Sequence, residues 1–506
     1  MSDPRNNWRS RALQGIAWNS LFQVFQAGIS FAVMLVLVHV VPPVEYGRFA
    51  AVTGLTGLIN VASCGQFMTQ ALQLPEGADP HWSRHFSAGV YIQGLLTLIC
   101  WLTAAVCWTL PTVRPLAPLL LIASLNFMLD VFNLLGDISL RRQLDFRRLR
   151  IVHAAGTLAS TMVSLGLGLD GFGAYAFVIA NVFNALPFTI DLLLLRRWRP
   201  QAGWWRMPDW REYRASFQFG LRQGGAALLN NARSFAESMV LPGAVGLFAM
   251  GLWNRAQGLY RSSVGRMIPL LLDALYPVLP RYAADLEQYP RQATLVVQVM
   301  LWATIPPGIF LGIEGPTVSR LLYGQRWIAA DPLLWPGALV GIGFSCFSVC
   351  YVVLLAASRL KDCTVLDVVS GLLLTSAILF PWLHSGMTVY AWMLATAQLA
   401  AAGFALNRAR RFMIRGWMRM TLLPPVVSAA LAATLTYWCN ARLPLHLALK
   451  AAGLAAVYGL CTLVLLRLLF ADQLRTLAQR LPLVNRYQHL LLFSRQAAAA
   501  AGGNPS

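Results

Sequence analysis

The stretch His85–Leu110, HFSAGVYIQGLLTLICWLTAAVCWTL, decides the fold class of this chain, because its 26 residues include no Asp, Glu, Lys or Arg. At about 1.5 Å of rise per residue, a helix of this length crosses a hydrocarbon core of roughly 30 Å. Arg84 precedes the stretch and Arg114 follows it. The sequence therefore predicts a membrane-spanning helix with a charged loop at each end.

Similar apolar stretches continue along the chain in both directions. With 57% hydrophobic residues, 12% charged residues and a mean hydropathy of +0.57, the composition excludes a soluble globule. The predicted fold class is an all-α polytopic membrane protein with about 14 transmembrane helices. The predicted spans run approximately over 14–40, 46–72, 85–110, 115–139, 151–169, 172–195, 214–241, 245–280, 292–313, 331–357, 363–382, 387–406, 420–438 and 445–470.

The basic residues alternate between the two sides of the predicted spans. Of the 40 Lys and Arg residues, 29 fall in one set of loops and 6 in the opposite set. Positive charge is retained on the cytoplasmic side, so both termini are expected in the cytoplasm. The net charge of +20 is then explained by basic residues in the cytoplasmic loops, which fix the orientation of the chain and lie beside the anionic inner leaflet. No nucleic-acid partner is expected, because no basic segment is interleaved with aromatic residues.

The remaining chemistry-bearing residues form no known catalytic or metal-binding pattern. The eight cysteines lie in or at the edges of spans, without a paired CxxC, and the seven histidines are scattered. We therefore expect no metal, no disulfide and no cofactor. The spacing of a nucleotide cradle or a catalytic triad is also missing from the sequence, so the chain is not expected to be an enzyme.

The two halves of the chain repeat. The segment 47–51 (GRFAA) corresponds to 246–250 (GLFAM), at an offset of roughly 199 residues and just past a proline turn in each case. Six spans per copy is an even number, so the copies are parallel repeats related by an axis along the membrane normal. The predicted domains are an N-lobe of helices 1–6 (1–197), a cytoplasmic linker (198–213), a C-lobe of helices 7–12 (214–408), helices 13–14 with a C-terminal segment (409–495) and a disordered tail (496–506).

Spans 7 and 8 carry an excess of arginine inside the predicted membrane. A charge at the bilayer centre costs about 2.5–3.5 kcal/mol, so these residues must meet a partner or a water-filled cavity between the lobes. Guanidinium groups suit bidentate phosphate binding, which points to an anionic substrate. The alternative is that the arginines pair with Glu237, Asp273 and helix-end carbonyls, or reach to the interface. The predicted substrate-binding residues are Arg222, Arg233, Arg255, Arg261, Asn230 and Asn254, with Asn19 and Gln23 on a polar face of span 1.

Span 4 carries a different polar stripe. Asn126, Asp130, Asn133 and Asp137 follow the spacing i, i+4, i+7, i+11 and so share one helix face. Carboxylates and amide oxygens in one line suit a proton or Na⁺ site, while a polar seam between helices would use the same pattern. The candidate ion-coupling residues are Asp130, Asp137 and Glu237.

Several motifs resemble the polysaccharide-exporting (Wzx/WzxC-like) branch of the multidrug/oligosaccharidyl-lipid/polysaccharide exporter superfamily. They are 141–149 (RRQLDFRRL), 219–221 (FGL) with Asn230, 246–248 (GLF), 252–256 (LWNRA), 276–281 (YPVLPR) and 321–327 (LLYGQRW). The resemblance implies a flippase of the bacterial inner membrane. It would move undecaprenyl-pyrophosphate-linked oligosaccharides from the cytoplasmic to the periplasmic leaflet by alternating access. The carboxylates and amides of span 4 make an H⁺ or Na⁺ gradient the candidate driving force. A polysaccharide polymerase and co-polymerase are the candidate partners, beside the lipid-linked substrate and the bilayer.

Two other functions stay open on the sequence. A cation-coupled drug antiporter of the same superfamily usually has twelve spans and an acidic, aromatic cavity, whereas this chain is arginine-rich. A membrane polymerase, ligase or glycosyltransferase usually has a large external loop, whereas no predicted external loop here exceeds about 20 residues. The flippase is the preferred interpretation.

Overall fold

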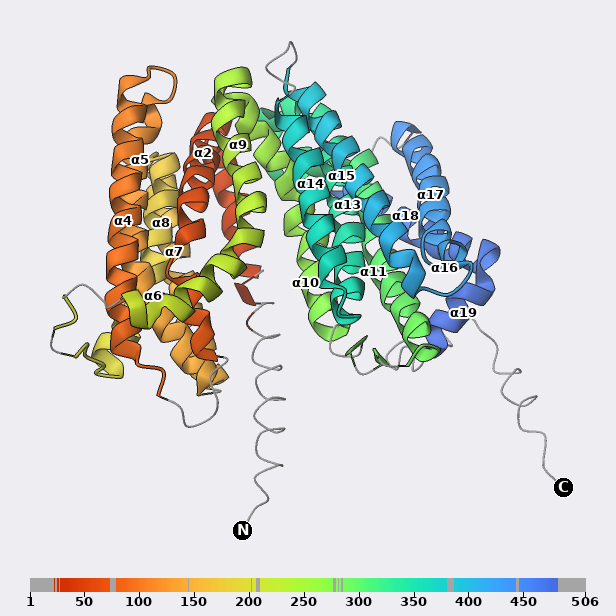
Figure 1. Ribbon diagram of the computed structural model, residues 1–506. Coiled ribbons are helices and arrows are strands. Elements are labelled where there is room, and N and C mark those ends of the chain that lie inside the picture. The colour runs from red at the N-terminus through yellow and green to blue at the C-terminus, as the bar shows by residue number, and fades with distance from the viewer. Residues whose placement is uncertain are drawn as a thin grey trace. The chain divides into compact units, whose positions relative to one another are not determined.

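The computed structural model describes residue 22 and residues 25–480, apart from short gaps at 27, 73–78, 144, 202, 206–209, 276–278, 281, 284, 380–385 and 443–445. Between 215 and 240 it describes the backbone and only two side chains, those of Gln218 and Glu237. The described part is built from helices and connecting turns (Figure 1). The predicted tail 496–506 lies outside the described residues.

The helices follow the predicted spans closely. Each of the fourteen predicted stretches is overlapped by a helix, the first of them by the apolar helix Gly28–Val40. The longer helices are α2 (Pro43–Ile59), α4 (Trp82–Thr109), α6 (Leu125–Arg142), α7 (Phe146–Leu169), α8 (Ala174–Ile190), α9 (Trp210–Ser262), α10 (Val264–Leu275), α11 (Gln288–Ile313), α13 (Asp331–Ala356), α14 (Leu360–Leu379), α15 (Met387–Ala409), α17 (Leu423–Arg442) and α18 (Leu447–Leu469). Shorter ones are α3 (Gly65–Met68), α5 (Ala117–Ala123), α12 (Gly315–Tyr323), α16 (Trp417–Thr421) and α19 (Ala471–Arg480).

Nine helices in the described part of the chain are long and apolar enough to cross a membrane. The protein is therefore an all-α, multi-pass membrane protein, as predicted. The total of fourteen spans and the cytoplasmic placement of both termini stay predictions.

The chain folds into two compact units. The first comprises the residues up to Ala256 with Leu322–Leu333 and Asp367–Leu394, and the second comprises Gln257–Leu321, Leu334–Leu366 and the residues from Ala395 onwards. This division differs from the predicted lobes, which rest on the sequence repeat and stay a prediction.

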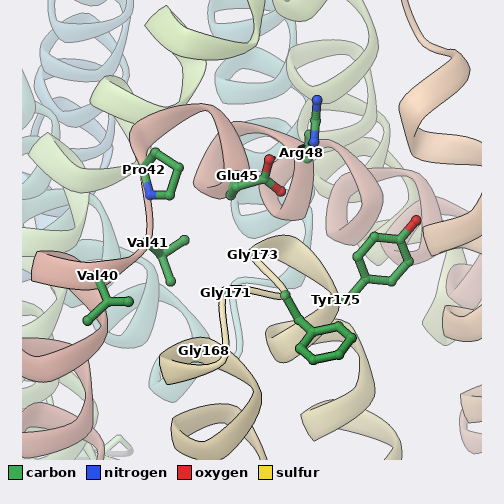
Figure 2. A pocket seen from close by; sticks show the side chains of 10 residues that line it. Val40, Val41, Pro42, Glu45, Arg48, Gly168, Gly171, Gly173 and Tyr175 are labelled. Carbon is green, nitrogen blue, oxygen red and sulfur yellow. Dashed lines mark hydrogen bonds and ion pairs between the residues drawn. The ribbon is translucent and has the colours of Figure 1, made fainter.

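In the first unit, a glycine turn joins α7 to α8 and receives a side chain from α2. Gly173 has φ +59°, a left-handed backbone that favours glycine, and a Cβ there would lie 2.7 Å from Oε2 of Glu45. The same carboxylate oxygen accepts the Ala174 N–H at 2.9 Å, while Oε1 accepts from Nη1 of Arg48 at 2.6 Å. Figure 2 shows Glu45 on α2 close to the turn with Gly171 and Gly173. The turn thereby fixes α2 against the first residues of α8.

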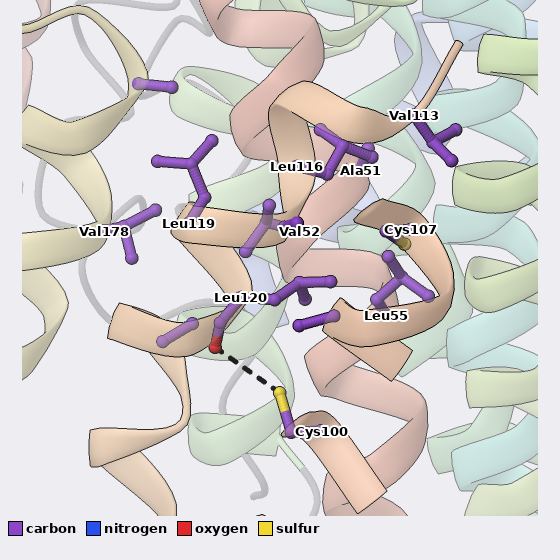
Figure 3. Close-up of a cluster of buried hydrophobic side chains, with 14 of the residues drawn as sticks. Ala51, Val52, Leu55, Cys100, Cys107, Val113, Leu116, Leu119, Leu120 and Val178 are labelled. Carbon is purple, nitrogen blue, oxygen red and sulfur yellow. Dashed lines mark hydrogen bonds between the residues drawn. The ribbon is translucent and has the colours of Figure 1, made fainter. Parts of the chain in front are cut away.

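The core of the first unit lies between α2, α4, α5 and α8. Ala51, Val52 and Leu55 of α2 pack with Cys100 and other buried side chains of this cluster (Figure 3). Small residues such as Ala51 and Cys100 let neighbouring helices approach closely. In lipid there is no hydrophobic driving force between helices, so this close packing stabilises their association. The Cys100 thiol donates to the Leu120 carbonyl at 3.5 Å. Six of the eight cysteines are buried, in keeping with a packing role.

Helix α9 contains a sharp break at Gly246, where φ is 86° and ψ is 157°. The Trp253 indole N–H donates to Oε1 of Glu237 at 2.9 Å across this break. In a straight helix these two residues would be about 24 Å apart along the axis, so the chain must fold back at Gly246. The break separates two helical segments that match the predicted spans 214–241 and 245–280.

The second of these segments crosses α2 with backbone in direct contact. A Cβ at Gly47 would overlap the Leu247 carbonyl, and a Cβ at Gly251 would overlap the Pro43 carbonyl. Glycine at both positions is therefore required for this crossing. The sequence repeat aligns Gly47 with Gly246, but at the crossing each of Gly47 and Gly251 faces the other helix.

An ion-paired cluster joins α6, α7 and the π-turn Asp191–Leu195 that extends α8. Asp191 is 2% exposed and lies 2.8 Å from Nε of Arg148 and 2.9 Å from Nε of Arg196. Arg196 also donates from Nη1 to the Ser139 hydroxyl at 2.7 Å. A buried carboxylate held by two guanidinium groups is satisfied electrostatically, so Arg148 and Arg196, which lie in two predicted loops, have a structural role.

In the second unit, α11 packs against α10, α16, α17 and α18. The Tyr458 hydroxyl of α18 donates to the Pro306 carbonyl at 2.7 Å. From α17, the Asn440 amide donates to Oε2 of Glu314, which follows α11, at 2.6 Å. These hydrogen bonds attach the C-terminal helix pair to α11 and the residue that follows it.

Candidate functional site

Arg255 lies in the second segment of α9, within the first unit. Its guanidinium carbon is 4.2 Å from the ring centroid of Tyr46 on α2 and 5.9 Å from that of Tyr323 at the end of α12. Cation–π contacts of this kind hold an arginine in a fixed position without neutralising its charge. The side chain borders a cavity of about 250 Å³. The cavity is lined by the helix Gly28–Val40, α2, α7 and α8, through residues that include Ser30, Tyr46, Phe49, Ser160, Thr161, Ser164, Phe177 and Asn181.

Four buried donor atoms around Arg255 have no acceptor among the described residues. They are Nε and Nη1 of Arg255 and the hydroxyl groups of Tyr46 and Tyr323. The two tyrosines are 2% and 1% exposed. Buried polar atoms are nearly always hydrogen-bonded in proteins, and each unpaired donor costs about 1–3 kcal/mol. A cluster of unpaired donors beside a fixed positive charge suits an anion with several acceptor oxygens.

The segment around Trp327 holds this cluster in place. Its indole N–H donates to the Val38 carbonyl at 3.0 Å, and its ring lies 5.5 Å from that of Tyr46. Arg326 donates to the Val40 carbonyl at 3.3 Å. The motif 321–327, which carried part of the sequence resemblance, thus packs against the end of the helix Gly28–Val40. The Glu45 contacts with the glycine turn fix the other side of α2 (Figure 2).

A second cavity of about 150 Å³ is adjacent to the first, and Phe49 and Asn181 line both. Asp130 and Asn126 of α6 border this second cavity. Asp130 accepts one long hydrogen bond, 3.4 Å from Nδ2 of Asn133. Among the described residues that line the two cavities, Arg255 is the single cation and Asp130 the single anion. Arg255 lines the first cavity and Asp130 the second.

The other two predicted ion-coupling carboxylates have close partners. Asp137 lies 2.6 Å from Nε of Arg141 and 3.3 Å from Nε2 of His153. Glu237 accepts the Trp253 indole N–H across the α9 break. Asp130 is thus the predicted carboxylate that faces the cavity. The ion-coupling role stays a prediction for all three.

The remaining predicted binding residues are distributed as follows. Arg261 is exposed and donates to Oε1 of Gln257 at 2.7 Å, and Asn254 is half-buried and is not among the residues that line the Arg255 cavity. The side chains of Arg222, Asn230 and Arg233, on the first segment of α9, lie outside the described residues, as do Asn19 and Gln23.

Sequence reasoning missed four residues of the site. Tyr46 and Tyr323 contact the arginine through their rings, and Asn181 and Phe49 line both cavities. Asn181 gave a usable signal, because it is a polar residue within the apolar stretch 172–195. The tyrosines gave none, since a buried tyrosine in a membrane helix usually packs against its neighbours.

Solved transporter structures share this fold. The lipid II flippase MurJ in its inward closed conformation aligns with a TM-score of 0.67 at 14% identity, covering 91% of this chain and all of the MurJ chain. An inward-facing multidrug resistance MATE transporter of the MOP superfamily aligns with a TM-score of 0.58 at 15% identity, covering 78% of this chain and 97% of its own. At such identities the likeness concerns the fold alone.

Relatives by sequence come from polysaccharide biosynthesis. The amylovoran biosynthesis protein AmsL of Erwinia amylovora is 24% identical over 236 residues, which is 43% of this chain and 56% of AmsL. The teichuronic acid biosynthesis protein TuaB of Bacillus subtilis (strain 168) is 20% identical over 216 residues, 40% of this chain and 42% of TuaB. The chain thus spans about half the length of these two relatives.

The family that matches is described as Polysaccharide biosynthesis protein, and the match covers residues 36–332. This range is more than half of the 506 residues and includes Tyr46, Asp130, Arg255 and Tyr323. The chain therefore belongs to the Polysaccharide biosynthesis protein family, and its fold is that of multi-pass membrane transporters and flippases.

Proposed function

We propose that this protein is a flippase for undecaprenyl-pyrophosphate-linked oligosaccharides, moving them from the cytoplasmic to the periplasmic leaflet of the bacterial inner membrane. The observation that carries the proposal is the cluster of unpaired donors around Arg255. Family membership supports the polysaccharide pathway, and the shared fold supports transport rather than catalysis.

The chemistry of the substrate explains why such a cluster is needed. A pyrophosphate that enters hydrocarbon loses its water shell. The free-energy cost is very large, because the charges are then unpaired in a low-dielectric medium. The Arg255 guanidinium and the two tyrosine hydroxyl groups offer fixed donors that replace this water. The substrate must also be released, so a moderate affinity spread over several residues suits alternating access.

The same donors argue against the alternative functions. A cationic drug would be repelled by Arg255 and would leave the buried donors unpaired. A polymerase or glycosyltransferase is less well supported, because the structural relatives named above are transporters. Coupling to an H⁺ or Na⁺ gradient, and cooperation with a polymerase and co-polymerase, remain part of the proposal.

Substitution of Arg255 tests the proposal in a strain whose own gene is deleted. Arg255→Ala should lower surface polysaccharide at least tenfold and cause lipid-linked oligosaccharide to accumulate in the cytoplasmic leaflet, at unchanged protein abundance. Arg255→Lys should recover part of the export, since it restores the charge without the bidentate fork.

Arg291→Ala is the matched control. Arg291 is an exposed arginine at the start of α11, paired at 2.9 Å with Glu287 in the preceding turn. Its loss should leave export at the wild-type level, because exposed pairs contribute little. Wild-type export by Arg255→Ala would show that this arginine is structural and would refute the proposal.

A further inference from the structure

We infer that the second cavity, lined by Asp130, Asn126 and Asn181, binds the saccharide of the lipid-linked substrate and determines which sugars are accepted. The inference rests on the proposed function, because it places the pyrophosphate at Arg255. It assigns Asp130 to sugar recognition rather than to ion coupling.

The two cavities lie along one face of α2, and the length of this face suits an extended ligand. Tyr46, Phe49, Thr53, Thr56 and Asn60 line the two cavities from one face of α2 and its terminal turn. At about 1.5 Å of rise per residue, this face extends over roughly 21 Å. Polar side chains line both cavities: Ser160, Thr161 and Ser164 line the first, and Thr53, Thr56 and Asn60 line the second. A saccharide, which presents hydroxyl groups over a length, can contact polar groups in both.

The donors and acceptors also match a saccharide. Asn126, Asn181 and Asp130 line the second cavity, and Asp130 accepts a long hydrogen bond of 3.4 Å from Nδ2 of Asn133. A carboxylate accepts hydrogen bonds from hydroxyl groups, and an amide both donates and accepts. These groups lie on different helices, Asn126 and Asp130 on α6 and Asn181 on α8. Together they can contact a hydroxyl-rich ligand from two sides.

The charges at the two ends fix the orientation of the substrate. Asp130 repels a pyrophosphate, while Arg255 attracts it. Because the two cavities are adjacent and share Phe49 and Asn181 in their lining, we place the pyrophosphate of the substrate beside Arg255 and its first sugar beside Asp130. The reverse orientation would set a pyrophosphate against the carboxylate.

Binding of two lipids to the full-length protein in nanodiscs tests this assignment. The first lipid is undecaprenyl pyrophosphate, which has no sugar. The second is the pool of undecaprenyl-pyrophosphate-linked oligosaccharide extracted from the source bacterium after deletion of this gene. We expect the wild-type protein to bind the extracted pool about tenfold more tightly than the sugar-free lipid. Equal binding would overturn the inference.

Variants then locate the sugar contact. Asp130→Asn and Asn181→Leu, on separate helices, should each remove most of this preference and leave the affinity for undecaprenyl pyrophosphate unchanged. The control Asp170→Asn, at an exposed carboxylate that follows α7, should change neither affinity. Equal losses for both lipids, or no loss in either variant, would overturn the inference. Normal saccharide affinity with lost Na⁺ or H⁺ dependence of transport in Asp130→Asn would also overturn it, in favour of ion coupling.

Arg255→Ala separates this inference from the proposed function. It should weaken the binding of both lipids, because both contain the pyrophosphate. If Arg255→Ala weakens neither, the pyrophosphate assignment fails, and with it the proposed orientation. If Arg255→Ala weakens both while the Asp130 and Asn181 variants keep the wild-type preference, the flippase proposal stands and the sugar assignment fails.

Discussion

At the scale of single residues, the arginine was predictable and its surroundings were not. Arg255 is a charged residue in an apolar span, and the cost of burying it marks a functional candidate from sequence alone. Tyr46 and Tyr323 are distant from it along the chain and meet it only through the fold. The pairing of Asp137 with Arg141 and His153, and of Glu237 with Trp253, also depends on rotamers and helix contacts that the sequence does not specify.

Replacement of Tyr46 tests the framing of the arginine. Tyr46→Leu removes both the ring that faces Arg255 and the hydroxyl donor, so the affinity for undecaprenyl pyrophosphate in nanodiscs should fall by roughly 5- to 30-fold. Tyr46→Phe keeps the ring and should lose less. Tyr437→Leu is the control, because Tyr437 is 65% exposed on α17. Wild-type affinity in Tyr46→Leu would show that the ring has no part in binding.

At the scale of the elements, hydropathy located the helices well, because in lipid every backbone group must be bonded within a helix. The sequence also predicts a boundary between 241 and 245, close to the break at Gly246 in α9. It does not predict the crossing of α2 with α9. Gly47 and Gly251 are two of 39 glycines, and only the three-dimensional contact distinguishes them.

The α9 break gives a prediction with a matched pair of glycines. Gly246 has a backbone conformation essentially restricted to glycine, so Gly246→Ala should destabilise the protein by about 1–3 kcal/mol. Neither Gly246 nor Gly243 would bring a Cβ within 4 Å of another group, so crowding does not enter the comparison. Gly243→Ala, three residues earlier, should be neutral or slightly stabilising. Thermal unfolding in detergent measures both, and equal melting temperatures would contradict the account of the break.

At the scale of the whole molecule, the sequence predicted the all-α membrane fold and the polysaccharide pathway correctly. The predicted topology depends on the asymmetry of the arginines across the loops. The predicted cleft between the lobes stays a prediction, whereas the cavity found in the first unit is lined by helices of the first half together with Arg255. The sequence pattern predicts which helix faces are polar, but the packing of the helices determines which faces lie against one another.

Cysteine accessibility tests the topology in a background where all eight native cysteines are replaced by serine. Thr112 and Gln143 are exposed positions at opposite ends of the helical segment Arg114–Arg142. A membrane-impermeant maleimide should label Thr112→Cys in intact spheroplasts and Gln143→Cys only after lysis. The reverse pattern would invert the topology and the direction of transport.

Transport by the purified protein in liposomes tests directly whether Arg255 carries the lipid-linked oligosaccharide across the membrane. A fluorescent undecaprenyl-pyrophosphate-linked oligosaccharide is placed in both leaflets, and an impermeant reagent then quenches the label that reaches the outer surface. Wild-type protein should expose nearly all of the label with time, Arg255→Ala should expose only the fraction already outside, and Arg291→Ala should behave as wild type. Equal exposure by Arg255→Ala and wild-type protein would show that Arg255 is not needed for flipping, and no exposure by either would show that the protein is not a flippase for this lipid.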